Sequence, residues 1–242
     1  MKVTFLGTRG YIKIRSDRHR LHTALLLEHD GVRVMVDAGE DWLGKLDDVS
    51  PDYLVLTHAH PDHAWGLKHG APCPVYATRE TWEIIKAYPI SKRHTITPRR
   101  RVRVGSLHVR AHAVAHSTRA PAVALHVSNG RSALCYAPDV VFIEDRGDAL
   151  SGTDLYVGDG ATIQRSMVRR SGDALIGHAP VRTQLTWCQK EGVPRALFTH
   201  CGTEIVSAEE TQVAAQIASL GKERGVRAGI AYDGMSFKLN PR

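Results

Sequence analysis

The sequence has no long apolar run, few cysteines and no internal repeat, and each of these absences excludes a class of protein. No run approaches the roughly 20 apolar residues that a membrane-spanning helix needs. The opening residues, Met1 to Gly7, read as a strand and lack the long apolar core of a signal peptide. Because no composition shift marks a linker, we expect a single domain over residues 1–242.

The four cysteines are scattered along the chain and form no Cys-x-x-Cys pair. A structural zinc site is therefore not expected, because no spacing offers two neighbouring thiolates. Scattered cysteines of this kind are typical of reduced, mostly buried thiols, so we expect a cytoplasmic protein.

Acidic charge is too scarce to balance the basic residues, which leaves a net charge of +7 and a pI near 9.4. The excess gathers in four places: Arg18-His19-Arg20, Lys92-Arg93-His94, Arg99-Arg100-Arg101 with Arg103, and Arg165 with Arg169 and Arg170. Such patches attract phosphate polyanions, and nucleic acid is one expected partner. A solvated surface in a basic protein explains them equally well.

What the sequence does contain is a dense group of metal-ligand side chains at residues 57–63, Thr-His-Ala-His-Pro-Asp-His. The group directly follows a short apolar run at residues 53–56, so a strand ends in a loop that presents three imidazoles and a carboxylate. Neutral imidazole and carboxylate suit zinc, manganese or iron, whereas calcium requires oxygen ligands. The spacing therefore predicts a metal site.

One loop cannot encircle a metal, so further ligands are expected from other strand ends. Three positions fit, because each places a ligand-type side chain directly after an apolar run: His116, Asp139 and His200. Together with His58, His60, Asp62 and His63 they are enough to hold two metal ions.

The hydrophobic pattern predicts strands first, then a helix, then strands again, in two similar halves. The expected strands are residues 3–6, 24–27, 32–36, 53–56, 101–104, 107–113, 122–127, 133–136, 155–157, 195–199 and two within 226–239. Helices are expected over residues 79–88, after Pro180, and after a capping box of Ser207 and Glu210. This order favours two packed sheets with helices outside.

With these residues in place, the chain resembles the metallo-β-lactamase superfamily over essentially its whole length, from Phe5-Leu6-Gly7 to Tyr232-Asp233-Gly234-Met235. The resemblance implies an α/β fold, an αββα sandwich of two mixed β-sheets with helices on the outer faces. It also implies roles for the ligands: His58, His60 and His116 for one metal, Asp62, His63 and His200 for the second, and Asp139 as the bridge.

Within the superfamily, the chain is most similar to the phosphodiesterase branch of the tRNA 3′-processing endonuclease Z and the phosphoribosyl cyclic-phosphate phosphodiesterases. The local signals are Phe5-Leu6-Gly7-Thr8, residues 37–40, His116-Ser117, and Gly177-His178 placed 22 residues before His200. In that branch the extra histidine contacts the phosphate and protonates the leaving oxygen. The endonuclease's long protruding arm and the cysteine-rich zinc insert of some cyclic-phosphate enzymes have no counterpart here.

The resemblance thus implies a dinuclear metal-dependent phosphodiester hydrolase, nuclease-like, with zinc or manganese as the expected divalent ions. Asp62 and His178 are the expected catalytic residues, His178 as general acid beside a hydroxide that the two metals share. No membrane partner is expected, and a homodimer is, because superfamily relatives are often dimers. The alternatives are a phosphodiesterase of small cyclic or nucleotide phosphates, a lactone or ester hydrolase of the same fold, and a non-catalytic metal-binding module.

Two further carboxylates are candidates for orienting the ligand imidazoles through their free N–H groups, Asp37 and Asp159. A turn explains both equally simply, because each precedes a glycine within two residues. His22, His94 and His112 are expected to be core or surface residues, although His112 alternates with His116 along one strand face.

Overall fold

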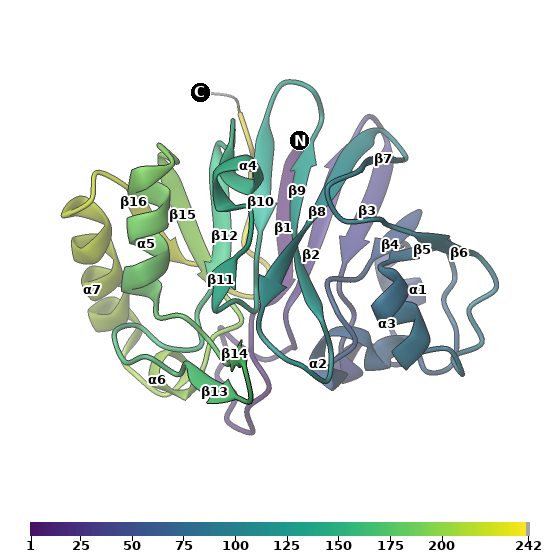
Figure 1. The fold of residues 1–242 in the computed structure, drawn as a ribbon, viewed down its shortest axis with the longest axis horizontal. Helices are drawn as coiled ribbons and strands as arrows, with labels where there is room; N and C mark the ends of the chain where they lie inside the picture. The colour runs from purple at the N-terminus through teal and green to yellow at the C-terminus, as the bar shows by residue number, and fades with distance from the viewer. Residues whose placement is uncertain (241–242) are drawn as a thin grey trace.

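Two β-sheets pack face to face in the computed structural model, and helices cover their outer faces (Figure 1). The structure describes residues 1–240, so the last two residues of the expected domain lie outside the described residues. None of the helices within this range is both long and apolar enough to cross a membrane.

The first sheet contains seven strands, and the structure gives it the order β17-β1-β2-β3-β4-β5-β6. The bounds are β1 Lys2–Gly7, β2 Ala24–His29, β3 Val32–Val36, β4 Tyr53–Val55, β5 Val75–Ala77, β6 Arg93–Thr95 and β17 Ser236–Lys238. Strands β3 to β6 run parallel, whereas β17, β1, β2 and β3 pair antiparallel, so the sheet is mixed.

The second sheet contains eight strands in the order β11-β8-β9-β10-β12-β15-β16, with β7 also paired to β8. The bounds are β7 Arg101–Val104, β8 Leu107–Ala115, β9 Ala122–Ser128, β10 Ala133–Tyr136, β11 Phe142–Ile143, β12 Leu155–Asp159, β15 Arg195–Thr199 and β16 Arg227–Ile230. A separate hairpin joins β13 Arg169–Ser171 to β14 Ala174–Ile176.

The helices divide between the two sheets. Their bounds are α1 Leu46–Val49, α2 Pro61–Ala64, α3 Arg79–Ile84, α4 Arg146–Leu150, α5 Val181–Lys190, α6 Thr203–Val206 and α7 Glu210–Lys222, with short 3-10 turns at Glu40–Trp42 and Trp65–Leu67. Helices α5 and α7 lie against the second sheet, and α1 and α3 lie beside the first (Figure 1).

Alternating side chains build the core between the sheets, because successive residues of a strand point to opposite faces. In β1 the inward residues are Val3 and Phe5, both fully buried. They join inward residues of the second sheet such as Val109 and Leu125 in one apolar cluster. The predicted sandwich of two mixed sheets with outer helices is confirmed.

The predicted helix boundaries need two corrections. Helix α3 ends at Ile84 and not at residue 88, because the chain turns before Pro89. The capping box of Ser207 and Glu210 is wrong: Ser207 ends the short helix α6, and the carboxylate of Glu209 caps α7 by accepting from the N–H groups of Thr211 and Gln212. Strands β5, β6 and β11, the β13–β14 hairpin and the short helices α1, α2, α4 and α6 were not predicted from the sequence.

The turn after β3 positions the helix that follows the histidine-rich loop. The N–H of Ala38 donates to the carbonyl of His63 at 2.7 Å, and the N–H of Gly66 donates to Ala38 at 2.8 Å. A Cβ on Gly39 would lie 2.0 Å from the carbonyl oxygen of Asp62. Only glycine therefore lets the turn approach α2 this closely.

We expect Gly39→Ala to lower the free energy of unfolding by about 1–3 kcal/mol, because the added methyl forces α2 away from the turn. The measurement is the urea midpoint of the variant and the wild type. Gly147→Ala in α4 is the matched control, because its nearest neighbour would be 3.6 Å away. An unchanged midpoint for Gly39→Ala would contradict the close packing described here.

Candidate metal centre

The histidine-rich loop is short, because it joins the buried strand β4 almost directly to the short helix α2. Leu54 and Val55 of β4 are fully buried, and His60 then takes an extended conformation as the N-cap of α2. Pro61 occupies the first helical position, where its missing N–H carries no cost. Asp62 and His63 thus lie in the first turn of α2, close to the end of β4.

The other predicted ligands come from the second sheet, each just after a strand. His116 follows β8, Asp139 follows β10 and His200 follows β15. His200 has a φ of 53°, a left-handed conformation that is rare for a non-glycine residue. Such conformations persist only where surrounding contacts hold them, often at functional sites.

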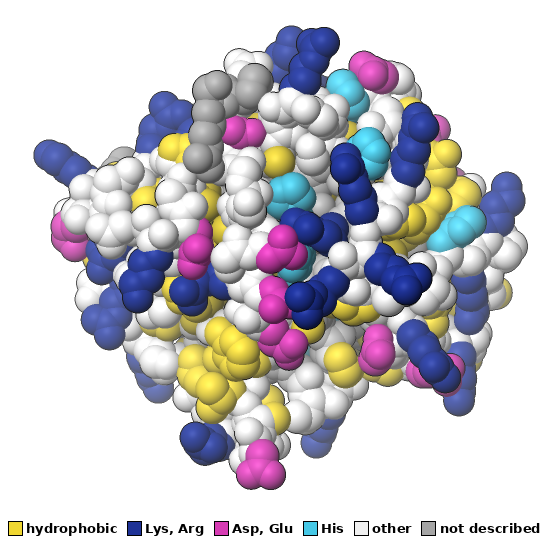
Figure 2. Space-filling model, turned by 45° about the horizontal axis from the view of Figure 1, so that its top comes forward, with side chains coloured by type: hydrophobic (Ala, Val, Ile, Leu, Met, Phe, Trp, Pro, Cys, Tyr) yellow, Lys and Arg dark blue, Asp and Glu magenta, His cyan; other side chains and the backbone are white. Residues whose placement is uncertain are grey.

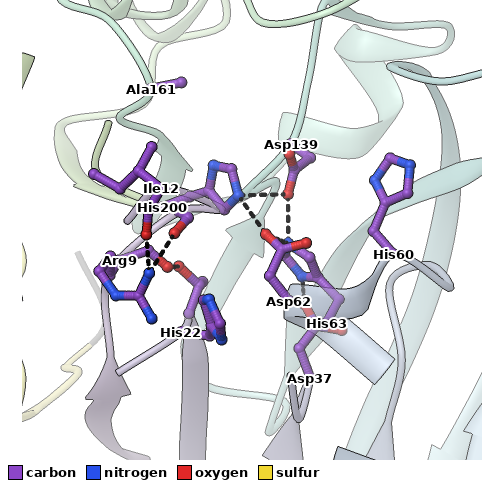
Figure 3. Close-up of polar contacts among 12 residues, drawn as sticks. Arg9, Ile12, His22, Asp37, His60, Asp62, His63, Asp139, Ala161 and His200 are labelled. Atoms are coloured by element: carbon purple, nitrogen blue, oxygen red, sulfur yellow. Dashed lines mark hydrogen bonds and ion pairs between the residues drawn. The ribbon is translucent and has the colours of Figure 1, made fainter. Parts of the chain in front are cut away.

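These side chains converge on one buried location where the ends of the two sheets meet. Figure 3 shows five of them, His60, Asp62, His63, Asp139 and His200. On one side, His60 Nδ1 lies 3.0 Å from His58 Nε2 and 3.2 Å from His116 Nε2. On the other, Asp62 Oδ2 lies 3.0 Å from His200 Nε2 and 3.3 Å from His63 Nε2.

Asp139 lies between the two groups. Its Oδ1 is 3.5 Å from His116 Nε2, and its Oδ2 is 2.7 Å from His63 Nε2 and 3.4 Å from His200 Nε2. The ligand atoms of His58, His60 and His116 all lie within 4.8 Å of one another, as do those of Asp62, His63 and His200. The structure therefore brings together all seven predicted ligands, in the two predicted groups.

The electrostatics divide the imidazoles into two kinds. Burial, and then the neighbouring His116, lowers the pKa of His60 to about 4, and burial likewise holds the pKa of His58 well below its usual value. Burial opposes charge at His200 too, but Asp139, Asp159 and Asp62 raise its pKa to about 10. One group is thus neutral imidazole, and the other consists of imidazoles crowded by carboxylates.

The donor set suits divalent metal ions. His63 Nε2 and Asp139 Oδ2 are buried and 2.7 Å apart, yet neither has a hydrogen-bond partner of acceptable geometry within residues 1–240. Buried polar atoms are normally satisfied, so this unsatisfied pair fits a shared cation. Tetrahedral or five-coordinate imidazole and carboxylate sites suit zinc and related metals. The His and Asp clusters therefore fit divalent ions.

Asp37 orients two imidazoles of the first sheet. It is fully buried, and its Oδ2 lies 2.9 Å from Nδ1 of His63. Thr57 donates to Asp37 from both its N–H, at 2.8 Å, and its hydroxyl, whose oxygen lies 3.0 Å from Nδ1 of His58. These distances are the ones that the predicted orienting role of Asp37 requires.

On the second sheet, Asp159 lies closest to His178, which is not one of the seven predicted ligands. Its Oδ2 lies 2.7 Å from Nδ1 of His178, while its Oδ1 is 3.8 Å from Nδ1 of His200. His178 Nδ1 is itself 3.6 Å from Asp139 Oδ1, so His178 belongs to the same cluster. Burial opposes charge on His178, but Asp159 raises its pKa above the usual value.

The remaining histidines lie outside this cluster, as expected. His94 stacks on Tyr76 with ring centroids 4.5 Å apart. His112 lies near Asp148, at 3.9 Å, and not beside the ligands. His22 is buried, with its Nδ1 3.0 Å from Asp41.

A cavity of about 890 Å³ opens onto the cluster, with His60, Asp62, His116, Asp139, His178 and His200 in its wall. Of the predicted basic groups, only Arg165 and Arg169 line it, joined by Arg119. Arg18 is instead paired with Glu210 at 2.6 Å, and Arg93 donates to the carbonyl of Lys86. Lys and Arg side chains elsewhere are interspersed with acidic ones on the face in Figure 2.

Arg9, which is only 2% exposed, was not predicted from the sequence to be near the site. Its Nη2 lies 2.5 Å from Asp41, its Nε donates to the carbonyl of Arg20, and its Nη1 contacts the carbonyl of Ile12 (Figure 3). It therefore fixes the loop that borders the cavity. No pattern in the sequence distinguishes this arginine from the solvated ones.

The sequence matches the beta-lactamase superfamily domain over residues 32–201, and the chain belongs to that superfamily. No curated protein matches it.

Solved structures share the fold at low identity. The metallo-beta-lactamase fold protein YhfI from Bacillus subtilis is 16% identical, with a TM-score of 0.74 over 98% of both chains. A diphosphatase of the PhnP family is 16% identical, with a TM-score of 0.73 over 100% of this chain and 99% of its own. The short form of human tRNase Z is 17% identical, with a TM-score of 0.68 over 99% of both. At these identities the likeness shows the shared fold alone.

We expect Asp37→Asn to weaken metal binding about 10- to 100-fold, the usual effect of losing a carboxylate behind a ligand imidazole. An amide cannot accept hydrogen bonds from Thr57 and His63 in the same way. The measurement is a titration of the metal-stripped protein with Zn²⁺ against a chromophoric chelator. Asp52→Asn, which alters a surface contact to the N–H of Arg33, is the control and should bind metal normally. Equal affinities would refute the orienting role of Asp37.

Proposed function

We propose that this protein is a metal-dependent phosphodiester hydrolase, and that its two groups of ligands each hold one divalent ion. His58, His60 and His116 would hold the first, Asp62, His63 and His200 the second, and Asp139 would contact both. Zinc and manganese suit this set best, because it combines imidazole with carboxylate and contains no thiolate. Two such ions supply a water of near-neutral pKa and neutralise charge on phosphoryl oxygens.

The observation that carries the proposal is the position of His178. Its side chain is 19% exposed in the cavity wall, and its ring centroid lies 5.1 Å from that of His116 and 5.5 Å from that of His200. Nδ1 is engaged by Asp159, and no hydrogen bond of Nε2 is found among residues 1–240. Nε2 is therefore the atom that would deliver a proton to a leaving oxygen.

The charges around the cavity support a phosphate substrate over an ester or lactone. Arg119, Arg165 and Arg169 line the cavity, and none of them has a carboxylate within 4 Å in the described part of the chain. Guanidinium groups without a partner suit the oxygens of a phosphodiester. A neutral lactone carries no negative charge to pair with these guanidinium groups. Two of the structural neighbours, a diphosphatase and a tRNase, carry names that refer to phosphate bonds.

Removal of the imidazole of His178 should slow cleavage of diesters with poor leaving groups by about 10²–10⁴-fold, the usual contribution of a positioned acid. Diesters that release p-nitrophenolate should lose much less, because that group leaves without a proton. The measurement is kcat of metal-loaded His178→Ala on an alkyl diester and on an aryl diester.

The control for this experiment is His69→Ala, because His69 is exposed and lies outside the cluster. Equal losses on both diesters would indicate damage to the metal site. No loss on the alkyl diester would mean that His178 is not the acid.

A further inference from the structure

Two segments that sequence analysis could not place border the cavity. One is the loop between β1 and β2, and the other comprises the β13–β14 hairpin and the residues before it; Figure 1 shows both at the lower end of the molecule. Each carries a large apolar side chain in the cavity wall, Tyr11 and Met167, which are 57% and 46% exposed. Exposed apolar groups beside a cavity mark a binding surface.

Tyr11 is held in place despite its exposure. The N–H of Gly10 donates to the carbonyl of Cys201 at 3.0 Å, next to the ligand His200. On its other side, the buried guanidinium of Arg9 contacts the carbonyls of Gly10 and Ile12. Hydrogen bonds thus hold the backbone on both sides of Tyr11, and its ring centroid lies 5.9 Å from that of His22.

The backbone of Met167 is hydrogen-bonded to that of His178. The N–H of Met167 donates to the carbonyl of His178 at 3.3 Å. A Cβ on Gly177 would lie 2.2 Å from the carbonyl oxygen of Met167, so the two backbones are in direct contact. The apolar wall therefore stands beside the general acid.

The cationic part of the cavity is built from the same segment. The hydroxyl oxygen of Thr162 lies 2.8 Å from the carbonyl oxygen of Arg165 and 3.1 Å from Oε2 of Glu204, which also accepts from the N–H of Ile163. Glu204 also lines the cavity, and both of these contacts fall on its Oε2. The backbone of Arg165 is thus held in the cavity wall, and its guanidinium has no ion pair within residues 1–240.

We propose that the cavity binds one unpaired nucleotide of a nucleic-acid strand, with its base against Tyr11 and Met167 and the neighbouring phosphates against Arg119, Arg165 and Arg169. This inference rests on the proposed phosphodiester hydrolysis and assigns its substrate class. Bases stack on aromatic rings whatever their identity, and guanidinium groups pair with backbone phosphates. A cavity of about 890 Å³ accommodates such a unit.

The kinetic test compares two substrates with the same leaving group, thymidine 5′-(p-nitrophenyl phosphate) and methyl p-nitrophenyl phosphate. The metal-loaded protein should show the higher kcat/KM on the nucleotidyl ester. Tyr11→Ala should lower kcat/KM for that ester by about 5- to 150-fold, the range that one lost base–aromatic stack implies. It should leave the methyl ester unchanged, and Tyr11→Phe should behave as wild type.

Two neighbouring residues provide matched controls. Ile14 lies on the same loop and is 45% exposed, but it does not line the cavity, so Ile14→Ala should have no effect. Arg170 likewise lies beside Arg169 outside the cavity wall. Arg165→Ala should raise KM for a thymidine dinucleotide ester, whereas Arg170→Ala should not.

A binding measurement separates the two proposals. In calorimetric titrations, thymidine 5′-monophosphate should bind the wild type more tightly than 2-deoxyribose 5-phosphate, and Tyr11→Ala should remove the difference. If the methyl ester is hydrolysed but the base confers no advantage in either assay, the nucleotide site is refuted and the hydrolase stands. If neither ester is hydrolysed, the proposed function fails, and this inference fails with it.

Discussion

Seven ionisable side chains meet at one buried place, and removing that many polar groups from water is costly unless they satisfy one another. The cluster meets this requirement through alternation of charge. Burial alone would lower the pKa of His63, but the surrounding carboxylates of Asp62, Asp139 and Asp37 raise it well above its usual value. Reciprocally, burial favours the neutral form of Asp139, but His200, His116 and His63 hold its pKa well below. Divalent ions between these groups would complete the compensation.

This constraint links the two sheets. His58, His60, Asp62 and His63 come from the end of β4, whereas His116, Asp139 and His200 follow β8, β10 and β15 of the other sheet. Each sheet also supplies a buried carboxylate behind the cluster, Asp37 and Asp159. The site therefore lies at the seam, and the apolar core between the sheets determines the distances on which it depends. The cavity wall combines residues of this cluster with a loop and a hairpin that lie outside the core between the sheets.

The sequence predicts the ligands at the strand ends but not the other residues of the cavity wall, because only the ligands are tied to the pattern of buried strands. A short strand that ends in His-x-His-x-Asp-His leaves few alternatives, since its apolar side chains must be buried and its ligands then share one edge. His178 was found only through the spacing of a resembling family. Arg9 and Tyr11 were not predicted as site residues, because the burial of an arginine and the exposure of a tyrosine depend on tertiary contacts. The incorrect capping box has the same cause, because Ser207 is the C-cap of α6 and Glu209 is the N-cap of α7.

We propose that two metal ions held by this cluster give the protein its phosphodiesterase activity. The most direct test adds Zn²⁺ or Mn²⁺ stepwise to the stripped protein and follows bound metal and hydrolysis of bis-p-nitrophenyl phosphate in the same samples. We expect two ions to bind per chain and hydrolysis to rise as the second site fills. Saturation of the metal sites without any hydrolysis would contradict the account and leave a metal-binding protein with another role.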